Sequence, residues 1–297
     1  MSVGRSCSPL VEPDLSVLRD PLRKALKLPA HAIYTRWEWQ TRLTKVEFDI
    51  TMHSDPGTSV GEYLSPFNGD IDGAQIYFGL QTDVFKPGRP DPGWSTGTTI
   101  GKGLIFSTWW SFDAKDTRIA DDGYIQLGTH EGCFVGVRRP YEWGVGDYRV
   151  TLARGDADDV GDWFDLSIQP MESLPETVGT DSISATRPLP AGDSHWIGAL
   201  RFKRRDSLIP ATLSPKATSF LEVYGGAQTF AEIAQWHCDL QAFGDDERPV
   251  SAEGSYPTFP HGQDVPNCDT WFDASRDRVN LAFGGETKRL TPAGRLF

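Results

Sequence analysis

The chain has 297 residues and a formal net charge of −12, from 29 Lys and Arg against 41 Asp and Glu. Nucleic-acid binding needs clustered Lys and Arg, and the only compact basic group spans residues 201–205, so the composition argues against a nucleic-acid partner. Residues 1–9 lack the apolar core of a secretory signal, and no stretch approaches the roughly 20 apolar residues of a membrane span. We therefore expect a cytoplasmic protein without a membrane partner, unless a misassigned start site hides an export signal.

The first predicted element is a short helix over residues 14–27. Leu15, Leu18 and Leu22 share one stripe behind a possible cap at Asp14, and Pro29 ends the pattern. We expect residues 1–30 to form an N-terminal arm that carries this helix.

Strands follow, because apolar and polar residues alternate with period two in many short segments. Thirty glycines and 21 prolines are spread along the chain, as many turns require. The pattern leaves residues 233–240 open between strand and short helix. It predicts an all-β fold, a two-sheet antiparallel β-sandwich of the concanavalin or jelly-roll kind, with one domain over 31–290 and a tail over 291–297. The predicted strands are 34–41, 45–53, 73–81, 103–110, 124–127, 134–138, 147–154, 163–169, 196–203, 219–224 and 279–283.

Several short motifs in the middle of the chain carry a resemblance to a known family. They are a Gly-x-Gln strand, a Phe-Ser-x-Trp strand, a Glu-Gly turn and a Tyr-x-Trp-x-x-Gly-x-x-Tyr segment. With them the chain resembles an uncharacterised family of mostly bacterial, lectin-like β-sandwich domains, which implies a glycan-related role without an established reaction. The matching residues are Gly73, Gln75, Phe106, Ser107, Trp109, Glu131, Gly132, Tyr141, Trp143, Gly146 and Tyr148.

A first candidate site lies on the predicted strand 45–53. Alternation places Glu47, Asp49, Thr51 and His53 on one face. Retaining glycosidases use two carboxyl groups about 5 Å apart, so Glu47 and Asp49 are candidate catalytic residues, although the usual third carboxylate is missing. The alternative is the solvated outer face of an amphipathic strand.

A second candidate is a calcium site at Asn68, Asp70 and Asp72. These side-chain oxygens recur at alternate residues and are followed by Gly73, as at the opening of a calcium loop. The closing Glu of an EF-hand is absent. The alternative is an ordinary polar turn, so calcium is a possible cofactor and none is required.

A third candidate joins carboxylates to aromatic side chains. Glu131 and Glu142 stand near Tyr141 and Trp143 in the sequence, where a desolvated carboxyl group could act as a general acid and aromatic faces could stack on sugars. Packing of Trp143 in the core is the alternative. The predicted ligand-binding residues are Gln75, Trp94, Trp109, Trp110, His130, Tyr141 and Trp143.

These patterns lead to a functional prediction with two alternatives. No Gly-x-Ser-x-Gly elbow, P-loop or dinucleotide motif is present. We expect a non-catalytic protein that binds a glycan or another small polar ligand. One alternative is a glycan-processing hydrolase or lyase with acids drawn from Glu131, Glu142, Glu47, Asp49 and Glu222; the other is a structural module. Of the four cysteines, Cys238 and Cys268 are expected to be buried thiols, or a disulfide if the protein is exported.

Overall fold

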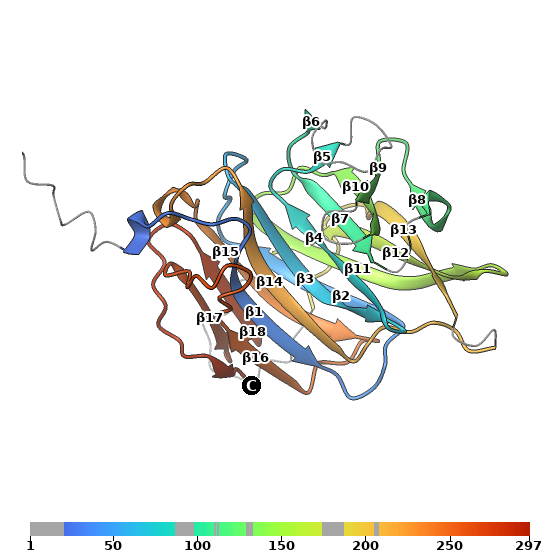
Figure 1. The fold of residues 1–297 in the computed structure, drawn as a ribbon. Helices are drawn as coiled ribbons and strands as arrows, with labels where there is room; N and C mark the ends of the chain where they lie inside the picture. Colours follow the sequence, from blue (N-terminus) through green and yellow to red (C-terminus); the bar gives the residue numbers. More distant parts are fainter. Residues whose placement is uncertain are drawn as a thin grey trace, which may run out of the picture.

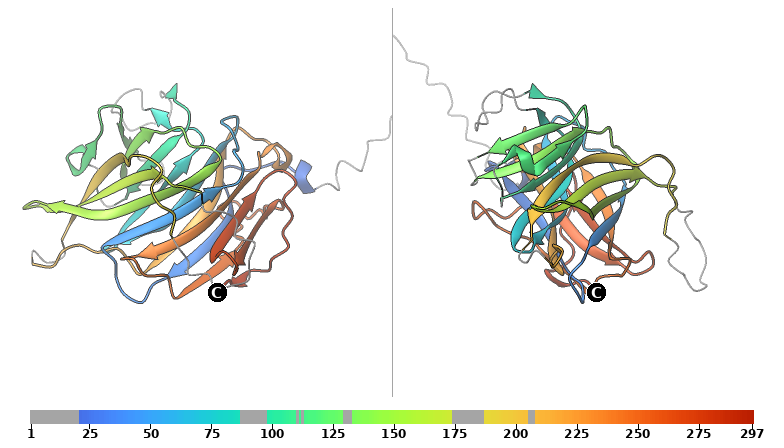
Figure 2. Two further views of the ribbon diagram at one scale, coloured as in Figure 1. Left: turned by 180° about the vertical axis from the view of Figure 1, so that it is seen from behind. Right: turned by 90° about the vertical axis from the view of Figure 1, so that its right-hand side faces the viewer.

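The computed structural model describes residues 21–86, 98–109, 111, 113–128, 133–173, 187–204 and 208–297. Almost all regular structure in these ranges is β-strand, arranged in two large antiparallel sheets and one two-stranded ribbon (Figure 1). The expected all-β architecture with two antiparallel sheets is therefore confirmed. Figure 2 shows the two sheets as stacked layers, as in a β-sandwich.

The first sheet has nine strands, and every adjacent pair in it is antiparallel. It faces the viewer in Figure 1. Its order is β19 (Gly294–Arg295), β16 (Ser251–Ser255), β1 (Ala30–Glu38), β14 (Lys216–Gly225), β3 (Gly61–Ile71), β4 (Ala74–Gln81), β7 (Gly103–Thr108), β10 (Phe134–Pro140) and β9 (Tyr124–Gly128).

The second sheet has eight antiparallel strands and lies behind the first. The remaining regular elements are the ribbon of β5 (Phe85–Lys86) with β6 (Thr98–Thr99) and three single 3₁₀ turns, η1 (Pro21–Arg23), η3 (Ala114–Asp116) and η4 (Phe230–Glu232). The order of this sheet is β17 (Cys268–Asp273), β18 (Arg278–Phe283), β15 (Trp236–Gly244), β2 (Lys45–Met52), β11 (Gly146–Ala157), β12 (Gly161–Pro170), β13 (His195–Lys203) and β8 (Thr117–Ile119).

The core fills the space between the two sheets. Every second residue of a strand points into it, because successive side chains of a strand face opposite sides. Trp37 of β1 meets Phe48 of β2 there, with ring centroids 6.1 Å apart. Burial of such large apolar side chains from both layers is the main stabilising contribution to the fold.

Strand β3 was not predicted, and it contains the first two residues of the candidate calcium loop. Asn68 and Asp70 lie on β3, and Asp72-Gly73 is the two-residue connection to β4. Both connecting residues have positive φ, 50° and 89°, as hairpin turns with Asp-Gly favour. The stretch is therefore a strand and a tight turn instead of an open loop.

The predicted N-terminal helix is not seen. Residues 14–20 lie outside the described ranges, and residues 21–27 contain only η1 and a single bridge between Ala25 and Thr229. Leu22 and Leu26 still pack against the core, so the apolar pattern is satisfied by an irregular segment and does not require a helix. Among the described residues there is no helix with the length and apolar character needed to cross a lipid bilayer.

Candidate functional site

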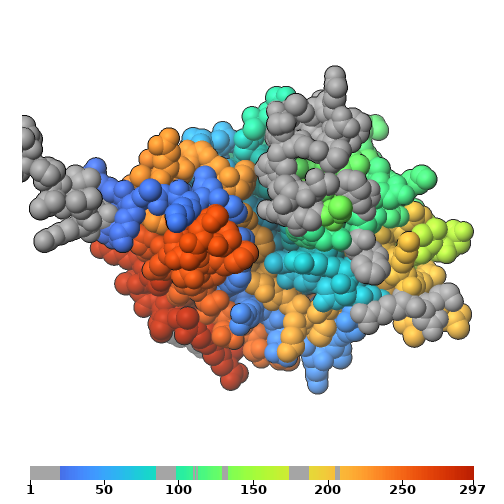
Figure 3. All heavy atoms as spheres, viewed as in Figure 1, coloured from blue at the N-terminus to red at the C-terminus, as the bar shows by residue number. Residues whose placement is uncertain are grey.

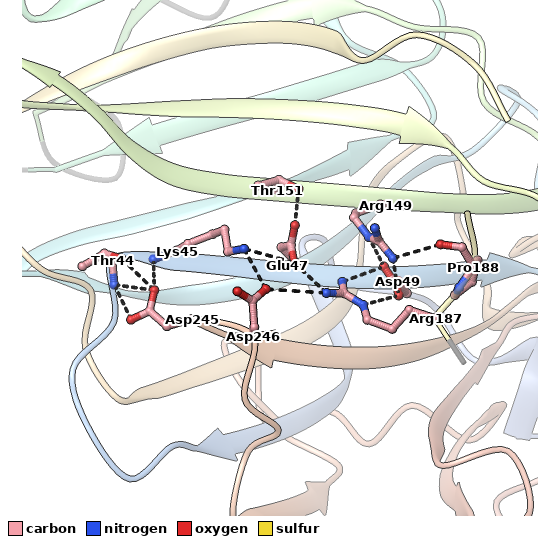
Figure 4. A network of polar contacts seen from close by, with 10 residues as sticks. All are labelled: Thr44, Lys45, Glu47, Asp49, Arg149, Thr151, Arg187, Pro188, Asp245 and Asp246. Atoms are coloured by element: carbon pink, nitrogen blue, oxygen red, sulfur yellow. Dashed lines mark hydrogen bonds and ion pairs between the residues drawn. The ribbon is translucent and has the colours of Figure 1, made fainter. Parts of the chain in front are cut away.

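The predicted pair Glu47 and Asp49 lies on the outer face of the eight-stranded sheet, inside a network of ion pairs (Figure 4). Asp49 is only 1% exposed, and Arg149 donates to both of its oxygens at 2.6 and 2.9 Å. Arg187 donates to Glu47 at 2.9 Å and also reaches Asp49. Each carboxylate is thus already bound by guanidinium groups, so the arrangement stabilises the sheet and holds no acid ready for catalysis.

His53, from the same predicted face, belongs to a neighbouring cluster around Asp239. The buried Asp239 carboxylate is bound by His53 Nε2 at 2.8 Å, Arg276 at 2.9 Å and Arg278 at 2.6 Å. Burial opposes ionisation, but the hydrogen bond from His53 and the two guanidinium groups outweigh it and hold the pKa of Asp239 below its ordinary value. This cluster is likewise fully paired.

The predicted calcium ligands are partly occupied by protein groups. Arg42 Nη2 binds Asp72 at 2.8 Å, and Asp70 accepts a hydrogen bond from the Gly73 backbone at 2.7 Å. Within the described ranges, no three His, Cys, Asp or Glu side chains are grouped closely enough to hold a metal ion. Calcium binding at this turn stays a proposal, and Arg42 would have to release Asp72 for it.

Trp143 packs in the core and does not line a ligand site. It is 2% exposed and stacks on Trp236, with centroids 5.1 Å apart and planes 16° from parallel. Tyr141 is half-buried against Tyr148 and His195, whereas Glu142 is exposed. The third constellation is therefore split between core and surface. Four of the predicted site residues lie outside the described residues: Trp94, Trp110, His130 and Glu131.

The remaining predicted residues, Gln75, Trp109 and Glu222, all lie on the outer face of the nine-stranded sheet, where Gln75 is beside Trp109 and Glu222 is in the row of Gln81, six residues along β4 from Gln75. Leu221 and Val223 point into the core, so Glu222 points outward from β14. A continuous file of aromatic rings crosses this face, with successive centroids 4.7 to 6.0 Å apart. In order across the strands the file is Phe259, His31, Phe220, Tyr63, Tyr77, Trp109 and Phe134.

Glu222 occupies the middle of this face, in one row with two polar side chains. Backbone pairing sets Glu222 opposite Tyr63 of β3, and Tyr63 opposite Gln81 of β4. Burial raises the pKa of Tyr63 well above its ordinary value, with Tyr77 and Glu222 adding to the effect. The Tyr63 phenol therefore stays protonated and can donate a hydrogen bond, and the Ser65 side chain lies near its buried hydroxyl.

Arg138 of β10 lies on the same face and is fixed by Gln81. Its side chain is buried, and Nη1 donates to Gln81 Oε1 at 3.4 Å. Because the amide oxygen of Gln81 accepts this bond, its nitrogen remains as a donor for another group. The row of Glu222, Tyr63 and Gln81, together with Arg138, thus places a carboxylate, a phenol, an amide and a cation on four strands of one sheet.

A hollow of about 360 Å³ lies further along the same face. Its lining carries both positively and negatively charged side chains. Arg36 has no ion-pair partner among the described residues. Figure 3 views this face, where side chains of β4 and β14 reach the surface beside the orange-red segment 256–264. The hollow is lined chiefly by Arg36, Glu38, Asn68, Lys216, Thr218 and Glu253.

Sequence reasoning missed Tyr63, Gln81 and Arg138. Tyr63 lies on the unpredicted strand β3, while Gln81 and Arg138 end two predicted strands whose neighbours are distant in the chain. The one available signal was Arg138 itself. Val135 and Val137 are apolar and alternate along the strand, so a charged residue at position 138 is expected on the opposite, outward face.

Comparison with known proteins gives no family. No family model and no curated protein matches the chain. Among solved structures, it is similar to SCP-B, a member of the eqolisin family of peptidases solved in complex with the tripeptide Ala-Ile-His, with a TM-score of 0.37. It is also similar to scytalido-glutamic peptidase solved with a transition-state analogue inhibitor, with a TM-score of 0.39. Each shares 10% identity, over 86% of this chain and 98% of the other.

The prediction of a non-catalytic carbohydrate-binding protein is wrong. Both of these structures are peptidases, which are enzymes. The residue expected to anchor a sugar, Trp143, is enclosed between the sheets, where no ligand on the surface can contact it.

Proposed function

We propose that the chain is a hydrolase whose active site is the outer face of the nine-stranded sheet, with Glu222 as the acid–base residue. The observation that carries this proposal is the row of Glu222, Tyr63 and Gln81, which sets a carboxylate beside a hydroxyl and an amide on three adjacent strands. We also propose that the two sheets have a concanavalin- or jelly-roll-like topology.

The row suits hydrolysis of an amide bond. Glu222 would take a proton from a water molecule while the water oxygen bonds to the carbonyl carbon. The Tyr63 hydroxyl and the Gln81 amide N–H would donate to the carbonyl oxygen as it becomes negative. Glu222 then passes the proton to the leaving nitrogen, the C–N bond breaks, and a carboxylic acid and an amine result.

The spacing of carboxylates favours a peptide over a glycan substrate. A glycosidase needs two carboxyl groups about 5 to 9.5 Å apart. On the described strands of this sheet, the other outward carboxylates are Glu38, Glu253 and Asp70, each at least four residues further along than Glu222. Four residues of strand span about 13 Å, so Glu222 has no second carboxylate from these strands within that range.

A glycan-processing hydrolase or lyase is the second candidate. The aromatic file favours it, because sugar rings stack on aromatic faces, and half-buried members such as Tyr77 and Trp109 are accessible in part. Release of reducing or unsaturated ends from a glycan panel, with protein substrates left intact, would decide for it.

The first test is digestion of unfolded casein by the purified chain between pH 3 and pH 8, read by mass spectrometry in ¹⁸O-labelled water. Wild type should release peptides whose new carboxyl groups carry ¹⁸O. Glu222→Gln should lower the rate about 100-fold or more, and Glu38→Gln, at the far end of the same face, should not. Absence of peptides at every pH, or equal rates for wild type and Glu222→Gln, would refute the proposal.

A further inference from the structure

Arg138 is a buried cation without a counter-ion among the residues that the structure describes. Its side chain is 5% exposed, and no carboxylate of the described residues lies within 4.0 Å of its guanidinium nitrogens. Its single hydrogen bond is the one from Nη1 to Gln81, and Nε has no partner in the described part of the chain. A buried guanidinium in this state costs free energy, because it has lost water without gaining an anion.

The other buried arginine of the described residues, Arg278, does have a counter-ion. Arg278 is equally buried, and its Nη1 binds Asp239 Oδ1 at 2.6 Å. Burial lowers the pKa of Arg138, and the nearby Tyr77, Tyr224 and Tyr63 oppose that effect. Three phenols thus surround the cation where the other buried arginine has a carboxylate.

Two further buried hydroxyls lie on the same face. The Ser107 hydroxyl has no hydrogen-bond partner among the described residues, and the Tyr63 hydroxyl has only the Ser65 side chain near it. Gly136 stands opposite Ser107 on the neighbouring strand, and a Cβ there would lie 2.4 Å from the Ser107 hydroxyl oxygen. Glycine therefore leaves room beside this hydroxyl that a side chain would fill, and both hydroxyls are donors suited to an oxygen anion.

We infer that Arg138 is the specificity residue for a carboxylate on the substrate, held by its guanidinium beside the Tyr63 phenol on the same face of the sheet as Glu222. A planar carboxylate matches the guanidinium fork, which accounts for Arg at this position. The inference rests on the proposed function for the substrate class, which is a peptide with an acidic side chain near the cleaved bond.

The test measures binding at equilibrium, without cleavage. Two blocked pentapeptides, Ac-Ala-Ala-Glu-Ala-Ala-amide and its Gln twin, are titrated into the full chain by calorimetry at pH 7. All proteins carry Glu222→Gln, which blocks the proposed cleavage; they are Glu222→Gln alone and Glu222→Gln combined with Arg138→Gln, Arg138→Lys or Arg36→Gln. Arg36→Gln is the matched control, because it removes one positive charge from the same face. Thermal melts establish that each variant is folded.

Glu222→Gln, alone or combined with Arg36→Gln, should bind the Glu peptide about tenfold or more tightly than the Gln peptide. Arg138→Gln should abolish the preference, and Arg138→Lys, which keeps the charge and loses the fork, should leave only part of it. The Lys variant keeps the test decisive if Arg138→Gln fails to fold.

Three outcomes would overturn the inference. One is equal affinity for the two peptides, or no binding of either at millimolar concentration. Another is a preference that survives in Arg138→Gln, which would place the counter-ion of Arg138 elsewhere in the chain. The third is tight binding of trigalacturonate without any preference for the Glu peptide, which would make the ligand an acidic glycan. A Glu222→Gln protein that keeps full activity and full Glu preference would refute the proposed reaction alone.

Discussion

Asp49 and Arg149 face each other on β2 and β11 and are joined by two parallel hydrogen bonds, of 2.6 and 2.9 Å. The Asp49 side chain is almost fully buried. Asp49→Asn should therefore destabilise the protein by about 3 to 5 kcal/mol, because it leaves Arg149 and Arg187 without their shared anion. Urea unfolding measures this. The exposed pair of Glu38 and Lys216 is the control, and Glu38→Gln should change stability by less than about 1 kcal/mol.

Glu62 should make stability fall as pH rises. It points inward from β3, and burial raises its pKa from 4.5 to about 9. The folded state therefore keeps a proton that the unfolded chain releases between these two pH values, so this contribution is complete below about pH 4.5 and is lost up to about pH 9.

The measurement for Glu62 is the free energy of unfolding at several pH values from 4.5 to 9. Within that window wild type should lose up to about 1.4 kcal/mol per pH unit relative to Glu62→Gln, which cannot ionise. Glu253→Gln, at an exposed position, should follow wild type. Parallel curves for wild type and Glu62→Gln would show that Glu62 is ionised in the fold.

Trp143 should prove structural. Replacing it by Ala removes a ring that stacks on Trp236 between the sheets, so we expect a loss of about 3 to 5 kcal/mol in chemical denaturation. Trp109→Ala is the comparison, since Trp109 is only half-buried and packs against Tyr77 with the ring planes tilted by 55°. Its stability loss should be smaller. A Trp143→Ala protein as stable as wild type would contradict the packing described for this ring.

The calcium proposal predicts a rise in melting temperature with millimolar calcium, lost in Asp70→Asn. Arg42→Gln should strengthen binding, because it releases Asp72 from its ion pair. Calorimetry without heat at millimolar calcium, together with an unchanged melting temperature, would remove the proposal.

Alternation of apolar and polar residues predicted well the strands in which this alternation is regular. Residues 196–203 were predicted as a strand, and β13 spans His195–Lys203. Residues 233–240 were left open, and β15 (Trp236–Gly244) is a strand whose buried Cys238 and Leu240 alternate with outward polar groups. Strand β3 was missed because Asn68 and Asp70 are spaced like calcium ligands, and the same spacing also describes the polar face of a strand.

The site could be predicted only in fragments. Glu222, Gln75 and Trp109 were all proposed from the sequence, each for a separate reason. The pairing of β14 with β3 and of β3 with β4 is what places Glu222 beside Tyr63 and Gln81, and residues 222 and 63 are far apart in the chain. Such register depends on tertiary packing, which local pattern does not contain. The separation of Arg138 from the carboxylates of the described residues is visible only in three dimensions.

The positions of the cysteines allow local opening of the eight-stranded sheet to be followed by thiol labelling. Cys238 and Cys268 are free thiols, buried on β15 and β17 with β18 between them, so their Cα atoms are separated by two strand spacings, about 10 Å, too far for a disulfide. Cys133 is free and exposed. A thiol reagent should therefore modify Cys133 at once and reach Cys238 and Cys268 only when this edge of the sheet separates. In a Cys133→Ser protein, the labelling rate of the remaining described thiols would time that event without any denaturant.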